Sequence, residues 1–248
     1  MRALLAVVLA LPLAACSGTD DDQVLTVLAA SSLADTFADL AELFEDEHPG
    51  TDVRLVLGSS TMLAEQVVDG APGDVLATAD ERSMRVAEDG STLADGPYAF
   101  AGNALTLVTP PQNRAGIASL TDLDREGVDY VVCAEAAPCG ALAVQLLDQQ
   151  EVAQPPASQE VDARAVLARV EQGEADAGLV YRTDAVAAGD AVTEVPLPEG
   201  LTTNYLVAPL HGDDAERSDL AAEFVTLVRS NRARQVLQDA GFSGVVVE

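Results

Sequence analysis

The sequence contains no lysine and no tryptophan, and only two histidines and three cysteines among its 248 residues. All 13 basic residues are therefore arginines, against 41 acidic residues, and the formal net charge is −28. A field of this sign repels nucleic acids and anionic membrane surfaces, so no nucleic-acid partner is expected. If the chain binds an anion, local dipoles and short hydrogen bonds must hold it against the long-range potential.

The scarcity of histidine also argues against catalysis and against a resident metal. His48 lies at a predicted helix end and His211 in a Gly-Asp turn, so both are expected at the surface. A hydrolase needs a nucleophile beside an oriented base, and the sequence has no GxSxG motif. We therefore expect no enzyme activity, no cofactor and no protein-ligated metal, with a secreted Ser or Cys hydrolase as the weaker alternative.

Long apolar runs are missing as well. Ala3 to Leu13 follows Arg2 and is too short to span a bilayer, so it is typical of an export signal. The sequence that ends in Cys16, LAAC, resembles the bacterial lipobox, in which the signal is cut before a cysteine that receives lipid. An ordinary cleavage site is the alternative. Residues 1–22 are predicted to be signal and tether, with an extracytoplasmic mature chain anchored to the cell membrane through Cys16.

The two remaining cysteines, Cys133 and Cys139, form an even pair in a chain predicted to leave the cytoplasm. A local disulfide is therefore expected, with two buried free thiols as the alternative. A catalytic thiolate ranks below both because it needs a cationic neighbour.

Strand-like runs alternate with helical patterns along the chain. Strands are expected at Val24–Leu28, Val53–Leu57, Asp74–Thr78, Leu105–Val108, Tyr130–Cys133 and Gly178–Tyr181. Helices are expected from Leu33 to Phe44, where HPG stops the helix, and from Met62, Glu81, Gly140 and Ala163. This alternation favours a parallel α/β sheet. A last helix with Leu220, Phe224 and Leu227 on one face is expected to precede a short apolar tail, Val245–Val247.

Five segments in order resemble the substrate-binding lipoproteins of molybdate ABC transporters. They are LTVLAASSL, SSTMLAEQVVDGAPGDVLATADERSM, GNALTLVTP, VDARAVLARVEQGEADAGLVYRTDAV and GFSGVVVE. The GAPGDVLATAD block followed by ERSM is the most specific of them, and LVYRTDAV is next. The likeness spans nearly the whole mature chain.

The resemblance implies an α/β, bilobal type II periplasmic-binding-protein fold with a ligand cleft between two lobes. Lobe 1 would contain residues 23–102 and 204–248, and lobe 2 residues 103–203. It further implies a monomer that captures molybdate or tungstate and delivers it to the membrane permease of an ABC importer.

The resemblance also implies a set of oxyanion-binding positions, which fall on Ser32, Ser60, Cys139, Ala163 and Tyr181. Cys139 and Ala163 can serve only through their backbone N–H groups, and Ser31 and Ser59 compete with their neighbours as donors. The structural alternative for each serine is a simple helix N-cap, and for Tyr181 a core strand residue.

Physical chemistry supports such a site. Ser32, Ser60, Cys139 and Ala163 each lie at a predicted helix start, where free N–H groups and the positive dipole end favour an anion. Four such starts form an anion site without a single Arg. Donors alone suit molybdate, tungstate and sulfate, whereas hydrogen phosphate needs an acceptor for its proton. Sulfate is therefore the main rival ligand, and a two-lobe sensor module is a third possibility that the export signal argues against.

Overall fold

The computed structural model describes residues 23–197 and 201–246. The predicted signal, Cys16 and the tether lie outside the described residues, as does the end of the predicted apolar tail. No helix in the described part of the chain is long and apolar enough to cross a membrane.

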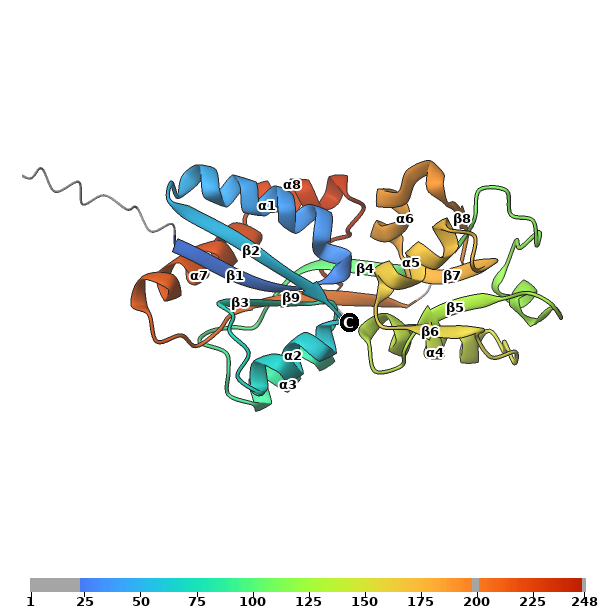
Figure 1. Cartoon of the computed structure of the whole chain (residues 1–248), viewed down its shortest axis with the longest axis horizontal. Helices are drawn as coiled ribbons and strands as arrows, with labels where there is room; N and C mark the ends of the chain where they lie inside the picture. Colours follow the sequence, from blue (N-terminus) through green and yellow to red (C-terminus); the bar gives the residue numbers. More distant parts are fainter. Residues whose placement is uncertain (1–22, 198–200, 247–248) are drawn as a thin grey trace, which may run out of the picture.

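Strands and helices alternate through most of the chain (Figure 1). The strands are β1 (Gln23–Ala30), β2 (Thr51–Gly58), β3 (Val75–Thr78), β4 (Tyr98–Thr109), β5 (Tyr130–Cys133), β6 (Ser158–Glu160), β7 (Ala177–Tyr181), β8 (Thr193–Val195) and β9 (Thr202–Pro209). The α-helices are α1 (Ala34–Glu47), α2 (Ser60–Val68), α3 (Glu81–Asp89), α4 (Pro138–Gln149), α5 (Ala163–Glu171), α6 (Arg182–Ala188), α7 (Ala215–Val228) and α8 (Asn231–Asp239). Short 3₁₀ helices are η1 (Ser31–Leu33), η2 (Leu120–Asp124) and η3 (Gly189–Ala191).

The strands follow the order β2-β1-β3-β9-β4-β7-β5-β6, with β8 also paired to β4. The pairs β1–β2, β1–β3, β5–β6 and β5–β7 are parallel, whereas β9 and β4 are antiparallel to their neighbours. The predicted parallel sheet is therefore wrong at the centre and correct in the two wings. The reason is that β4 and β9 run against each other between the wings, and β9 was not predicted as a strand.

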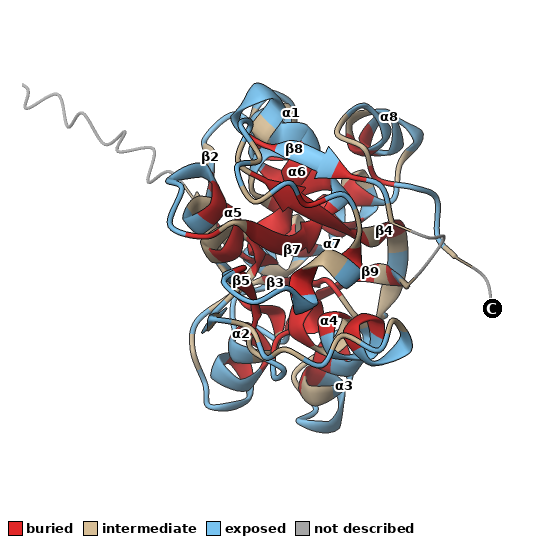
Figure 2. Cartoon of the chain, turned by 90° about the vertical axis from the view of Figure 1, so that its right-hand side faces the viewer, coloured by how far each residue is buried: buried red, intermediate tan, exposed pale blue. Residues whose placement is uncertain are grey.

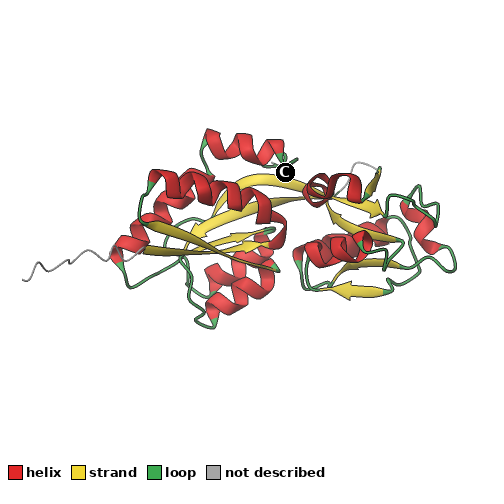
Figure 3. Cartoon of the chain, turned by 45° about the horizontal axis from the view of Figure 1, so that its top comes forward, coloured by secondary structure: helices red, strands yellow, loops and turns green. Residues whose placement is uncertain are grey.

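The strands and helices form two bodies (Figure 1 and Figure 3). One contains β1–β3, α1–α3, α7 and α8, and the other contains β5–β8 and α4–α6. Strand β4 belongs to both, because Tyr98–Ala104 pairs with β9 and Leu105–Val108 pairs with β7. The two bodies are therefore joined through the central pair β4–β9.

The central strands are buried, and helices lie on both sides of them (Figure 2). Helix α1 shows how the pattern produces this packing, since its buried residues are Thr36, Phe37, Leu40, Ala41 and Phe44 at helical spacing. The helix ends before His48, and Gly50 adopts a positive φ of 91° that allows the turn into β2. The stop predicted from HPG is confirmed.

The C-terminal region differs from its prediction. Helix α7 buries Ala221, Phe224, Val225 and Val228, while Leu220 and Leu227 are only half-buried. It is also not the last helix, because α8 follows with its own Ser230 cap. Helix α8 has few apolar residues, so its pattern was weak in the sequence.

Candidate functional site

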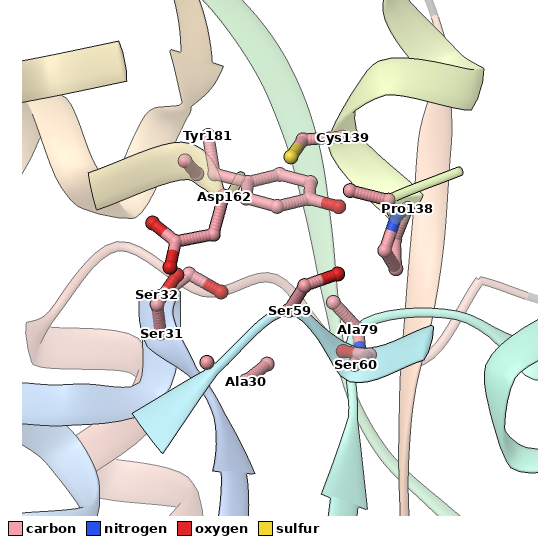
Figure 4. A pocket seen from close by; sticks show the side chains of 13 residues that line it. Ala30, Ser31, Ser32, Ser59, Ser60, Ala79, Pro138, Cys139, Asp162 and Tyr181 are labelled. Carbon is pink, nitrogen blue, oxygen red and sulfur yellow. The ribbon is translucent and has the colours of Figure 1, made fainter. Parts of the chain in front are cut away.

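A small cavity lies where the two bodies meet (Figure 4). Its lining comes from both bodies and consists of Ala30, Ser31, Ser32, Gly58, Ser59, Ser60, Ala79, Ala137, Pro138, Cys139, Asp162, Ala163 and Tyr181. All five predicted site residues are among them. The cavity is small, with a volume of about 10 Å³ for the centre of a water molecule, so it suits a ligand of a few heavy atoms.

The carboxyl ends of the strands place these residues. Strand β1 runs into η1 at Ser31, β2 runs into α2 at Ser60, and β7 runs into α6 after Tyr181. Ligands of open α/β sheets characteristically bind outside the carboxyl ends of the strands. The cavity occupies that position in both bodies.

Three of the helices that start at the cavity, η1, α2 and α4, lack a side-chain cap, whereas α5 is capped by Asp162. No side chain caps η1, α2 or α4, although serines and a cysteine stand at their starts. In contrast, α3, α7 and α8 are capped by the side chains of Asp80, Asp214 and Ser230. The serines at these starts therefore make no side-chain cap bond, and the first N–H groups of η1, α2 and α4 can donate to an anion.

Three buried hydroxyls add to the backbone donors. Ser60 Oγ accepts from Ala79 N at 2.9 Å, so its own proton remains free. Ser32 Oγ lies 2.7 Å from Tyr205 Oη. Tyr181 Oη is buried and has no hydrogen-bond partner among the described residues. A buried hydroxyl without a partner costs free energy, and a bound hydrogen-bond acceptor in the cavity would remove that cost.

Tyr181 remains a donor throughout the physiological pH range. Burial raises the pKa of its hydroxyl well above the usual value, and the nearby Tyr205 and Asp80 raise it further. The phenol therefore stays protonated and donates a hydrogen bond rather than carrying a negative charge towards the cavity.

The start of α4 is held close to β5. The structure joins Cys133 at the end of β5 to Cys139 in the first turn of α4 by a disulfide. A Cβ at Gly140 would lie 1.9 Å from the Ala134 carbonyl oxygen, so only glycine fits there. Cys139 thus lies in the first turn of α4, and its N–H belongs to the helix start.

Asp162 is the charged lining residue that sequence reasoning missed. It caps α5 by accepting from Ala165 N at 2.9 Å, and its carboxylate stands beside Ser31 and Ser32 in Figure 4. An Asp directly before a helical pattern is a common N-cap signal, but the sequence does not show that its side chain faces a cavity. No Arg lines the cavity among the described residues. The Asp162 carboxylate is therefore the one charged side chain in the described lining.

The two bodies also contact each other directly around the cavity. Thr61 Oγ1 in α2 donates to Ala136 O at 2.8 Å, and Arg82 in α3 donates to the same oxygen at 2.9 Å. On the other side, Arg164 in α5 pairs with Asp35 in α1. These bonds cross from one body to the other, so the structure has a closed arrangement.

Metal ligation has no support in the described part of the chain, where no group of three or more His, Cys, Asp or Glu side chains could hold an ion. The donors that the cavity offers are instead suited to an anion.

Sequence comparison finds relatives over nearly the whole chain. The family described as bacterial extracellular solute-binding protein matches residues 25–243. The chain is 35% identical over 227 residues to the molybdate-binding protein ModA of Mycobacterium tuberculosis, covering 91% of this chain and 86% of the relative. It is 31% identical over 235 residues to ModA of Escherichia coli, covering 90% of each.

Structure comparison agrees on the fold. The periplasmic molybdate-binding protein of Azotobacter vinelandii matches with a TM-score of 0.75 and 21% identity, covering 90% of this chain and 100% of that protein. The sulfate-binding protein SubI of Mycobacterium tuberculosis matches with a TM-score of 0.80 and 17% identity, covering 90% and 87%. The predicted bilobal periplasmic-binding-protein fold is confirmed. Its cavity lies between the lobes, and the chain belongs to the bacterial extracellular solute-binding proteins, which are extracytoplasmic binding components of transport and not enzymes.

Proposed function

We propose that this chain captures molybdate, and with it tungstate, for an ABC importer. The observation that carries the proposal is the set of uncapped helix starts and free hydroxyls around one small cavity without Arg. The 35% identity to a molybdate-binding protein supports the choice of anion. Ser32, Ser60 and Tyr181 would donate through hydroxyls, and Cys139 and Ala163 through backbone N–H groups.

Hydrogen-bond energetics are sufficient for tight binding. Each hydrogen bond to a charged group contributes roughly 1.5–3 kcal/mol net, so about five of them offset the cost of association. Molybdate and tungstate carry no proton at neutral pH and need only donors. Hydrogen phosphate would also need an acceptor for its proton, which the five proposed positions do not supply, and the Asp162 carboxylate in the cavity wall already accepts from Ala165 N.

Sulfate is the second candidate because it is also a proton-free dianion. The fold likeness to a sulfate-binding protein favours it, although that likeness concerns the fold alone. Metal–oxygen bonds are longer than sulfur–oxygen bonds. The size of the binding site in the closed form would therefore determine whether molybdate or sulfate binds more tightly.

The two lobes are proposed to be residues 23–102 with 204–248, and residues 103–203. The change of partner along β4 supports this division, since Ala104 still pairs with β9 and Leu105 already pairs with β7. Opening about β4 and β9 would expose the cavity, and the anion would favour the closed form because only that form completes the donor set.

Membrane attachment is proposed to run through lipidated Cys16, with the polar segment up to residue 22 as a tether. The LAAC sequence supports lipidation, and a lipid anchor would keep a monomeric binding protein near its permease. Mass spectrometry of the mature chain, isolated from bacterial membranes, would detect the lipid on Cys16 or show an unmodified residue there.

Isothermal titration of the mature chain with molybdate, tungstate, sulfate and phosphate tests the ligand. We expect binding of molybdate and tungstate at micromolar concentrations or below, much weaker binding of sulfate and no heat from phosphate. Tighter sulfate binding would transfer the proposal to sulfate. The absence of heat from all four anions would refute the oxyanion function.

Replacing Asp162 with Asn is expected to strengthen molybdate binding by about three- to tenfold. Asn caps a helix as well as Asp does, so α5 should keep its start, while one negative charge is removed from the cavity wall. Asp214→Asn is the matched control, because Asp214 caps α7 in the same way and does not line the cavity. Equal gains in both variants would mean that net charge alone is responsible.

A further inference from the structure

Behind Ser32 lies a buried tyrosine that does not line the cavity. Tyr205, on β9, is 0% exposed, and its Oη lies 2.7 Å from Ser32 Oγ. Its ring packs edge-on against Tyr181 and Phe242. The proposed donor Ser32 thus has a hydrogen-bond partner that is not part of the cavity lining.

The direction of the hydrogen bonds follows from the neighbouring asparagine. Asn103 Oδ1 accepts from Ala104 N at 2.9 Å, which places the Nδ2 amino group towards the interior. That group donates to Thr183 Oγ1 at 2.9 Å and to Tyr205 Oη at 3.3 Å. Because Asn103 can only donate from this side, Tyr205 Oη is an acceptor in that bond.

Among the described residues, the hydroxyl proton of Tyr205 then has one hydrogen-bond acceptor. Among the described residues, Ser32 Oγ is the sole bonded partner of Tyr205 that can accept it. Burial raises the pKa of Tyr205, so the proton is retained. If Ser32 donated to Tyr205 instead, the buried Tyr205 proton would have no acceptor, which is unfavourable.

We propose that Asn103 and Tyr205 are positioning residues that direct the hydroxyl proton of Ser32 into the cavity. The chain of bonds runs from Asn103 N–H to Tyr205 Oη, from Tyr205 O–H to Ser32 Oγ, and from Ser32 O–H to the anion. The Ser32 hydroxyl is therefore already oriented to donate to the ligand. Binding then does not cost the entropy of fixing that orientation. This inference rests on the proposed oxyanion function.

This chain of hydrogen bonds, from Asn103 through Tyr205 to Ser32, is called the relay below. It joins the binding site to the strands that connect the lobes. Asn103 lies on β4 and Tyr205 on β9, the two strands that link the bodies, while Thr183 belongs to α6 in the second body. All four side chains, Ser32 included, are at least nine-tenths buried. Water is thus largely excluded from competing for these bonds.

A double-mutant cycle tests the relay by titrating molybdate into four proteins, which are the unmodified chain, Tyr205→Phe, Ser32→Ala and the double variant. We expect Tyr205→Phe to weaken binding by about 5- to 20-fold. In the Ser32→Ala background the same change should alter the affinity by less than about twofold, because the residue through which Tyr205 acts is gone. A tyrosine with a merely structural role would weaken binding equally in both backgrounds, and that result would overturn the proposal, as would an unchanged affinity of Ser32→Ala.

Titration of the unmodified chain distinguishes a failure of this inference from a failure of the proposed function. If it binds none of the four anions, the oxyanion function fails. The relay itself is then decided by neutron diffraction of the unmodified, deuterated protein, which needs neither ligand nor variant. A deuteron bonded to Tyr205 Oη and pointing at Ser32 Oγ supports the relay, and a deuteron on Ser32 pointing at Tyr205 refutes it.

Discussion

Replacing Tyr181 with Phe is expected to weaken molybdate binding by roughly 10- to 100-fold, the value of one hydrogen bond to a charged group. The free energy of unfolding should stay the same or rise slightly. The reason is that Tyr181 Oη is buried without a partner among the described residues, so its removal breaks no bond within the protein and relieves an unpaired polar group. Calorimetric titration and urea unfolding measure the two effects.

Tyr130→Phe is the matched control for this variant. Tyr130 is equally buried and belongs to the same lobe, but its hydroxyl donates to Gln154 O and does not line the cavity. It should lose about 1 kcal/mol of stability and no affinity. The opposite pattern, with Tyr181→Phe unstable and still binding molybdate normally, would mean that Tyr181 is a core residue and not a ligand contact.

The second large effect is expected from Asp184, whose side chain is 0% exposed three residues after the cavity residue Tyr181. Burial raises its pKa to about 7, although Arg164 lowers it. Arg164 Nε lies 3.0 Å from Asp184 Oδ1, but neither atom makes an aligned hydrogen bond. The desolvation cost of the ionised form therefore outweighs the ion pair.

The raised pKa predicts a stability that falls with pH. Between about pH 4 and pH 7 the folded protein holds a proton on Asp184 that the unfolded chain releases, so this contribution to stability is present at low pH. As the pH rises towards 7, the free energy of unfolding therefore falls by up to about 4 kcal/mol over three pH units. Relative to Asp184→Asn, the unmodified chain should lose stability over this range, as measured by urea unfolding between pH 4.5 and 8.

Asp122→Asn provides the control of opposite sign. Hydrogen bonds from Ala118 N and Ser119 lower the pKa of Asp122, so its contribution is present at neutral pH and is lost as the solution becomes acidic. A stability difference between the unmodified chain and Asp184→Asn that does not vary with pH would show that Asp184 is ionised in the folded protein.

Local patterns predicted those elements whose buried face is strongly periodic. Helix α1 combines Phe37, Leu40 and Phe44 with an HPG stop, and both its face and its end could be read from the sequence. Helix α8 has only Ala233 and Leu237 buried, so its pattern was weak. Strand β9 was missed because its place in the sheet is set by long-range pairing with β3 and β4, which a local pattern does not encode.

The site shows the same division between local and long-range information. Ser32, Ser60 and Ala163 lie at helix starts that the sequence indicates, and the family resemblance brought them together with Cys139 and Tyr181. Asp162 and Tyr205 were not predicted. A cap residue gives no sign of the surface it faces, and the bond from Tyr205 to Ser32 joins residues 173 positions apart.

The bonds that close the lobes affect the time that an anion stays bound. Thr61 and Arg82 share the Ala136 carbonyl oxygen on one side of the cavity, and Arg164 meets Asp35 on the other. If an anion leaves only when the lobes part, these bonds hold it in addition to its own contacts. Its residence time is then limited by how often the lobes part, so a permease that draws the two lobes apart would hasten release without touching the anion.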